Sequence, residues 1–135
     1  MLLDSSALIA IMLQEPGWES LRDRIDEADV IAINAATLLE THMVLTSRTG
    51  KNALPLLEAL LQETGAYVIP FTEAHWRLAA EAFLRFGKGR HRAALNFGDC
   101  IAYATAQQAQ MPLLYKGSDF DRTDVPRLPG KQPRN

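Results

Sequence analysis

The sequence predicts an α/β protein: a three-layer α/β/α sandwich around a mainly parallel sheet of four to five strands. Short apolar segments alternate with longer segments of helical periodicity, in the order β-α-α-β-α-α-β-α-α-β. The short segments are apolar almost throughout, as strands are when helices cover both faces of a parallel sheet. At 135 residues the chain has the length of one ordinary domain.

The expected strands are short, and turn-forming residues separate them from the helices. Four are predicted, over residues 2–4, 30–33, 67–71 and 112–115, with a further short edge strand near residues 123–125. Right-handed connections bring the carboxyl ends of successive parallel strands to one edge of the sheet. Open α/β folds place their chemistry at that edge.

Capping residues mark the ends of the expected helices. Asn34 is a favourable N-cap, Ser5 or Ser6 is expected to cap the first helix, and Gly50 and Gly65 each end a helix. The first half of the last helix is apolar on nearly every side, which predicts a central position. The predicted helices cover residues 6–14, 17–28, 35–47, 52–64, 73–86 and 99–109.

The domain boundary is expected near the C-terminus. Residues 1–126 are predicted to form a single domain, because no linker or internal repeat divides them. Residues 127–135 contain prolines and basic residues and are predicted to form an extended or disordered tail.

Charge and cysteine content limit the classes of protein. Fourteen basic and sixteen acidic residues give a net charge of −2, so we expect no attraction of the whole molecule to nucleic acid. Cys100 is the single cysteine and cannot form an internal disulfide, and no basic leader with an apolar segment opens the chain. The longest apolar run, residues 7–13, is shorter than the roughly 20 residues that cross a membrane. We therefore expect a cytoplasmic protein without membrane contact.

Several common site types lack their sequence signature. The three histidines are far apart along the chain, and one cysteine is too few for a closed thiolate zinc site. There is no P-loop, no glycine-rich dinucleotide turn and no serine nucleophile elbow.

Three acids lie where predicted strands lead into helices. Asp4 ends the first strand, Glu40 lies at the edge of an apolar face formed by Leu38, Leu39, His42 and Leu45, and Asp99 opens the last helix. Carboxylates brought together must take up protons or bind a hard cation such as Mg²⁺ or Mn²⁺. Such a site can support metal-assisted phosphodiester hydrolysis. The ordinary alternatives are a helix cap for Asp4, an exposed position for Glu40 and a helix-dipole contact for Asp99.

Four segments in this order resemble the PIN-domain ribonucleases, specifically the VapC toxins of bacterial VapBC toxin–antitoxin pairs. They are Leu2 to Leu8, Thr37 to Glu40, Leu95 to Cys100, and Leu113 to Phe120 followed by Thr123 and Asp124. The resemblance covers the chain to about residue 126. It implies an Mg²⁺- or Mn²⁺-dependent endoribonuclease, a toxin homodimer and inhibition by a VapB-type antitoxin, with DNA bound only through the antitoxin.

The resemblance also implies residue roles. Asp4, Glu40 and Asp99 match the acidic positions that bind metal. At the fourth position Gly117 and Ser118 stand where family members often have an acid, so Asp119 is the nearest candidate, acting directly or through water with Ser118.

Substrate contacts are expected from the residues around the site. Ser6 is a candidate for orienting Asp4 or a bound water, and Arg90 and His91 of the basic loop 87–92 are candidates for RNA phosphate contacts. The ordinary alternatives are a helix cap for Ser6 and a solubilising surface turn for the loop. Excess leucine on the helix at 52–64 suggests an interface between copies of the chain.

Two rival functions remain open. One is a non-catalytic PIN-like interaction module that acts through antitoxin and operator DNA binding, which the imperfect fourth acidic position favours. The other is a metal-dependent phosphatase or DNA nuclease built on the same acids, which differs only in substrate.

Overall fold

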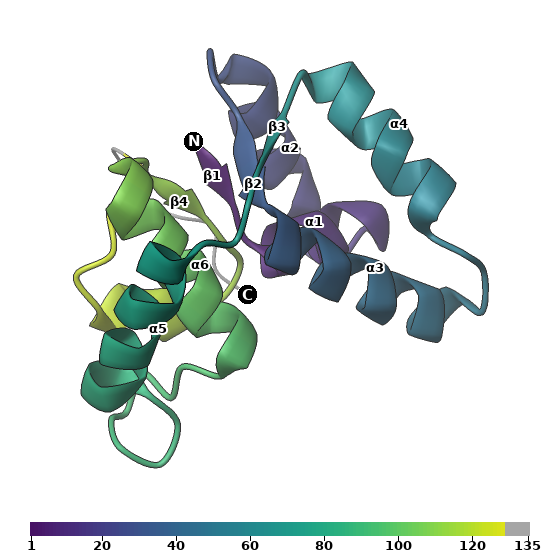
Figure 1. The fold of residues 1–135 in the computed structure, drawn as a ribbon. Coiled ribbons are helices and arrows are strands. Elements are labelled where there is room, and N and C mark those ends of the chain that lie inside the picture. The colour runs from purple at the N-terminus through teal and green to yellow at the C-terminus, as the bar shows by residue number, and fades with distance from the viewer. Residues whose placement is uncertain (129–135) are drawn as a thin grey trace.

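The centre of the protein is a four-stranded parallel sheet, seen in the computed structural model of Figure 1, which describes residues 1–128. The strand order is β3-β2-β1-β4. The chain adds β2 and then β3 on one side of β1 and afterwards crosses to add β4 on the other side. Strand addition thus reverses at β1, which creates the topological switch point where open α/β sheets bind ligands. The strands are β1 (Leu2–Leu3), β2 (Ala32–Asn34), β3 (Tyr67–Ile69) and β4 (Leu113–Leu114).

In the described residues, 1–128, six helices and one short 3-10 helix surround this sheet (Figure 1). Neighbouring residues of β1 enter different cores: Leu2 packs with α5 and α6, whereas Leu3 packs with α1 and α2. This alternation confirms the predicted three layers. The helices are α1 (Ser5–Met12), α2 (Trp18–Glu27), α3 (Ala35–Thr49), α4 (Leu54–Thr64), α5 (Glu73–Phe86), α6 (Phe97–Ala109) and the 3-10 helix η1 (Asp119–Arg122).

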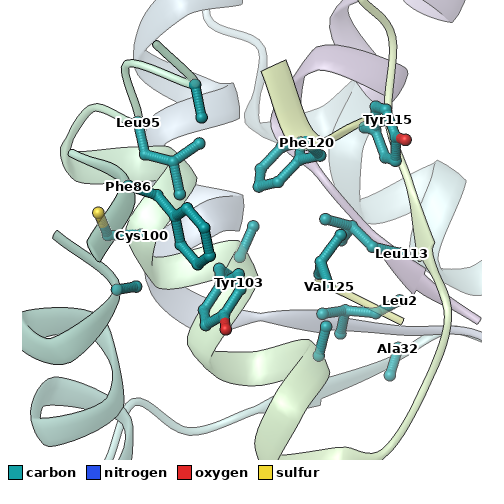
Figure 2. Close-up of a cluster of buried hydrophobic side chains, with 14 residues drawn as sticks. Leu2, Ala32, Phe86, Leu95, Cys100, Tyr103, Leu113, Tyr115, Phe120 and Val125 are labelled. Atoms are coloured by element: carbon teal, nitrogen blue, oxygen red, sulfur yellow. The ribbon is translucent and has the colours of Figure 1, made fainter. Parts of the chain in front are cut away.

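The core on the α5–α6 side is shown in Figure 2. Tyr103 of α6 packs against Phe86 of α5, and Tyr115 packs against Phe120. Residues 100–106 of α6 are all buried, which confirms the central position predicted from its apolar first half. Cys100 is 4% exposed and belongs to this core, as expected for a small apolar side chain.

Capping residues explain why the starts of α1 and α6 differ from the prediction. The N-cap of α1 is Asp4 rather than Ser5 or Ser6, because the Asp4 carboxylate accepts the backbone N–H of Ser6. Helix α6 begins at Phe97 rather than at residue 99, because Asn96 provides the cap.

Two further expectations are corrected by packing. The edge contact of β4 lies at Pro126 and Arg127 rather than at residues 123–125, since the N–H of Leu113 donates to the Pro126 carbonyl.

In α3 the buried positions are Thr37, Thr41 and Leu45, whereas Leu39 is 58% exposed. The apolar pattern had assigned Leu39 to the buried face.

Most of the predicted C-terminal tail, residues 129–135, lies outside the described residues. Within residues 1–128 no helix has the length and apolar character that crossing a membrane requires.

Asn34 fixes the start of α3 against α6. Its side chain is completely buried, with Oδ1 accepting the N–H of Ala36 at 2.8 Å and Nδ2 donating to the Thr105 hydroxyl at 3.0 Å. One residue therefore caps the helix that carries Glu40 and ties it to the helix that carries Asp99.

We expect Asn34→Ala to lower the free energy of unfolding by about 2 kcal/mol, because it removes a cap and a buried hydrogen bond. Asn52→Ala is the matched control: Asn52 also accepts the N–H two residues later, at 3.0 Å, but at an exposed helix start. Its loss should be roughly 0.5–1 kcal/mol. Urea unfolding followed by circular dichroism measures both, and equal losses would contradict the tie to α6.

Candidate active site

A pocket of about 330 Å³ opens beside the carboxyl ends of β1 and β4, at the topological switch point. Asp4, Glu40 and Asp99 line it together, although they lie far apart in sequence. The full lining is Asp4, Ser5, Ser6, Ile9, Glu15, Glu40, Arg48, Asn96, Asp99, Lys116 and Gly117.

Asp4 is only 2% exposed. Its Oδ2 accepts hydrogen bonds from the backbone N–H of Ser6, at 3.1 Å, and from the Ser6 hydroxyl. Within residues 1–128, its other oxygen, Oδ1, is buried and has no hydrogen-bond partner. A buried carboxylate with an unpaired oxygen is costly when ionised, so it requires a proton or a cation.

Glu40 reaches the pocket from α3 and lies against the backbone of α6. A Cβ atom placed on Gly98 would overlap both carboxylate oxygens of Glu40. Glycine is therefore required at position 98 for Glu40 to keep this position. Glu40 Oε1 is also buried, with no hydrogen-bond partner among the described residues.

Asp99 is held by a capping box at the start of α6. Its N–H donates to Asn96 Oδ1 at 2.9 Å, and its Oδ2 accepts the N–H of Asn96 at 3.1 Å. These reciprocal bonds fix the carboxylate in the first turn of the helix, where the helix dipole also favours negative charge.

Burial and mutual repulsion raise the pKa values of two of the acids. The pKa of Asp4 rises from 3.8 to about 7, mainly because the carboxyl group is buried and also because of the charges of Asp99 and Glu40, although the hydrogen bonds from Ser6 act in the opposite direction. Burial likewise raises the pKa of Asp99 to about 6, with repulsion from Asp119 and Glu40 adding to it. Burial, followed by the charge of Asp99, raises the pKa of the neighbouring Cys100 thiol to about 11. Cys100 therefore stays protonated at neutral pH and does not act as a nucleophile.

The donor set suits a hard divalent cation. It consists of carboxylate oxygens, two of them buried and unpaired in the described part of the chain. Within residues 1–128 no three acidic, histidine or cysteine side chains are grouped so that they could hold a metal ion by themselves. Mg²⁺ commonly keeps several waters and binds through only one or two carboxylates, so its chemistry fits converging donors of this kind.

The other candidate residues are placed less directly. Ser6 lines the pocket, but its hydroxyl is engaged within the protein, donating to Asp4 and accepting from the N–H of Lys116 at 3.0 Å. Ser118 and Asp119 are exposed and do not line the pocket. Asp119 nevertheless acts on Asp99 through its charge, and its role as a fourth ligand stays a prediction.

The basic loop does not reach the pocket. Arg90 donates to the carbonyl of Leu84 at 3.3 Å, and the His91 ring accepts the N–H of Ala93 and packs edge-on against Phe86. Neither Arg90 nor His91 lines the pocket, so contact with RNA stays a prediction for both.

Sequence reasoning missed three charged residues of the pocket, Glu15, Arg48 and Lys116. Lys116 comes directly after the predicted fourth strand, and that position was an available signal. Glu15 follows the end of α1 and Arg48 lies in the last turn of α3. They reach the pocket because α1 and α3 pack together, which no local pattern reveals.

Comparison with known proteins identifies the family. Residues 1–126 match the PIN domain family. Ribonuclease VapC36 of Mycobacterium tuberculosis is 44% identical over 126 residues, which are 93% of this chain and 91% of the relative. Ribonuclease VapC28 of the same organism is 42% identical over 128 residues, covering 94% of this chain and 96% of the relative.

Solved structures agree in fold. The crystal structure of Mycobacterium tuberculosis VapC20, a sarcin-ricin loop cleaving toxin, has a TM-score of 0.77 at 18% identity, with 98% of both chains covered. A toxin-antitoxin complex from Klebsiella pneumoniae has a TM-score of 0.69 at 18% identity, covering 96% of this chain and 98% of that chain. The chain therefore belongs to the PIN domain family, as a homologue of the mycobacterial VapC ribonucleases.

Proposed function

We propose that this chain is the toxin of a type II toxin–antitoxin pair, a divalent-metal-dependent endoribonuclease that hydrolyses RNA phosphodiester bonds. The observation that carries the proposal is the convergence of Asp4, Glu40 and Asp99 in one pocket at the switch point of the sheet. The homology to VapC ribonucleases supports RNA as the substrate rather than DNA or small phosphoesters.

Asp4, Glu40 and Asp99 would hold one or more Mg²⁺ or Mn²⁺ ions. A bound divalent ion supplies activation of water and stabilisation of the phosphate charge that builds up in the transition state. Ser6 orients Asp4 through a hydrogen bond, and the capping box with Asn96 orients Asp99. Gly98 has no side chain, which leaves space for the Glu40 carboxylate. Such supporting contacts fix the geometry of metal ligands.

A purely structural scaffold has no evident need for this pocket. Burying Asp4 and the oxygen of Glu40 without partners destabilises the folded chain, and an apolar filling would avoid that cost. Sites that keep such buried charge are commonly functional. This argument favours the enzyme over the non-catalytic interaction module.

A VapB-type antitoxin is the partner that the family relationship supports, and a related fold occurs in a toxin-antitoxin complex. Operator DNA would be bound only through that antitoxin, and the setting would be the cytoplasm. Leu54 and Leu56 on α4 are 49% and 51% exposed, which supports a homodimer that uses this helix.

The central test is RNA cleavage by the purified chain, free of antitoxin, with Mg²⁺ or Mn²⁺. We expect Asp4→Asn and Asp99→Asn each to slow cleavage on the order of 100-fold or more, because each removes a charged metal ligand. Asp26→Asn, which alters an exposed acid of α2 paired with Arg22, is the matched control and should cleave normally. Full activity of both site variants would refute this assignment.

Gly98→Ala tests the placement of Glu40. The new methyl group should displace the Glu40 carboxylate and lower activity roughly 10-fold or more, as misplacement of a catalytic group does. Alanine favours helices more than glycine does, by up to about 1 kcal/mol, so the melting temperature should stay level or rise. In a Glu40→Gln background the same change should have no further effect on activity. Unaltered cleavage by Gly98→Ala would show that Glu40 need not lie against Gly98.

The raised pKa values of Asp4 and Asp99 predict an unusual pH dependence of stability. Between pH 3.8 and about 7 the folded chain retains protons that the unfolded chain releases. The free energy of unfolding contributed by these groups therefore falls as pH rises through this window. In chelator, the melting temperature should drop from pH 5.5 to pH 7.5 by more in the unaltered chain than in Asp4→Asn.

Added Mg²⁺ should reverse that drop. At pH 7.5 millimolar Mg²⁺ should raise the melting temperature of the unaltered chain by several degrees, because it binds only the folded acid cluster. The effect should be small at pH 5.5, where protons compete, and small in Asp4→Asn at either pH. Differential scanning fluorimetry with and without chelator measures these shifts. An equal Mg²⁺ effect in both chains would exclude Asp4 as a ligand.

A further inference from the structure

The pocket contains positive charge that the three acids do not explain. Lys116 and Arg48 line the same cavity as the three acids, and they are its two basic lining residues. The side chain of Lys116 is only 13% exposed. Because the whole chain has a net charge of −2, an RNA backbone approaching the acids needs local positive charge of this kind.

Glu15 contacts both cations, but loosely. Lys116 Nζ lies 3.5 Å from Glu15 Oε1, and Arg48 Nη1 lies 3.7 Å from Oε2. Charge-assisted hydrogen bonds are shorter, about 2.7–2.9 Å, and the ion pair of Arg22 with Glu63 measures 2.6 Å. Loose, partly exposed ion pairs contribute little to the stability of the fold. A phosphate that binds the two cations more tightly can therefore replace Glu15.

The main chain holds Lys116 beside the catalytic acids. Its N–H donates to the Ser6 hydroxyl at 3.0 Å, and that hydroxyl donates to Asp4 Oδ2. The starting point of the lysine side chain is therefore fixed relative to Asp4 through a single bridging group. This arrangement pre-organises a cation next to the acids, which reduces the entropy lost when an anion binds.

A Schellman motif at the end of α1 holds Glu15 in place. The N–H of Glu15 donates to the carbonyl of Ala10 at 2.9 Å, and the N–H of Gln14 donates to the carbonyl of Ile11 at 3.3 Å. Gln14 adopts the left-handed conformation, with a φ of +51°, that is common at this kind of helix end. The end of α1 thereby places the Glu15 carboxylate between the two cations.

We propose that Lys116 and Arg48 form a subsite for an RNA backbone phosphate, and that Glu15 offsets one of their two positive charges until RNA displaces it. The inference rests on the proposed RNA cleavage. Arg48 lies roughly two helical turns, about 12 Å along the axis, beyond Glu40 on α3. The subsite therefore suits a phosphate that flanks the scissile bond.

The first experiment measures binding without cleavage. Fluorescence anisotropy of a labelled single-stranded RNA of random sequence is followed against salt concentration in the Asp99→Asn background. We expect Lys116→Met and Arg48→Met each to weaken binding about 3- to 10-fold at low salt and to reduce the log–log salt slope by about 0.7, the value for one lost phosphate contact. Lys116→Arg should retain both values. Arg77→Met, which removes an exposed cation of α5 paired with Glu73, is the matched control and should change neither.

Glu15→Gln separates a phosphate subsite from a merely structural network. If Glu15 competes with RNA for the two cations, its neutralisation should tighten binding about 2- to 3-fold. If the network only stabilises the fold, Glu15→Gln should lower the melting temperature and leave affinity unchanged or weaker. The second result would overturn the proposal, as would unchanged salt slopes in both cation variants.

Cleavage kinetics with Mg²⁺ complete the test in the otherwise unaltered chain. Loss of a flanking phosphate contact should raise KM with little change in kcat. A drop in kcat at unchanged KM would overturn the subsite. Failure of the unaltered chain to cleave RNA would instead refute the proposed function, because the binding experiment does not depend on cleavage.

Discussion

Buried negative charge at the carboxyl end of β1 is the constraint on which the rest of the site depends. Asp4 follows an inner strand with neighbours on both sides, so the sheet itself removes its carboxylate from water. Glu40 and Asp99 then add repulsion rather than relief. Carboxylates in such a cluster must either take up protons or bind a cation. The contacts of Ser6, Asn96 and Gly98 fix the positions of the three carboxylates, and therefore the position at which a cation would bind.

The hydrogen bonds that cap three helices in this protein also position the acids of the pocket. Asp4 caps α1, Asn34 caps the helix that carries Glu40, and Asn96 and Asp99 cap each other at α6. Each of these helices starts at or near the carboxyl edge of the sheet, where its free N–H groups attract polar side chains. The capping role of Asp4 and Asp99 and the catalytic role that we propose for them are therefore compatible, because capping orients both carboxylates.

The sequence predicted the parallel α/β architecture and the convergence of the three acids, because both follow from strand order and helix position. It did not predict the two basic residues of the pocket. Lys116 and Arg48 meet at Glu15 only because the end of α1 packs beside the end of α3. The outward position of Leu39 was missed for a similar reason. The threonines at 37 and 41 fill the buried face of α3, and Thr41 satisfies its hydroxyl through the carbonyl of residue 37.

The pocket contains both acids and bases, and this combination bears on how a protein of slightly negative net charge could accept a polyanion. The acids suit a divalent ion, whereas Lys116 and Arg48 provide fixed positive charge in the same pocket. Basic side chains can bind RNA phosphates whether or not a metal ion is bound. They contact the sugar–phosphate backbone rather than the bases. Glu15 offsets one of their two positive charges in the absence of RNA. Charge on the pocket wall can thus attract RNA locally while the surface as a whole stays slightly negative.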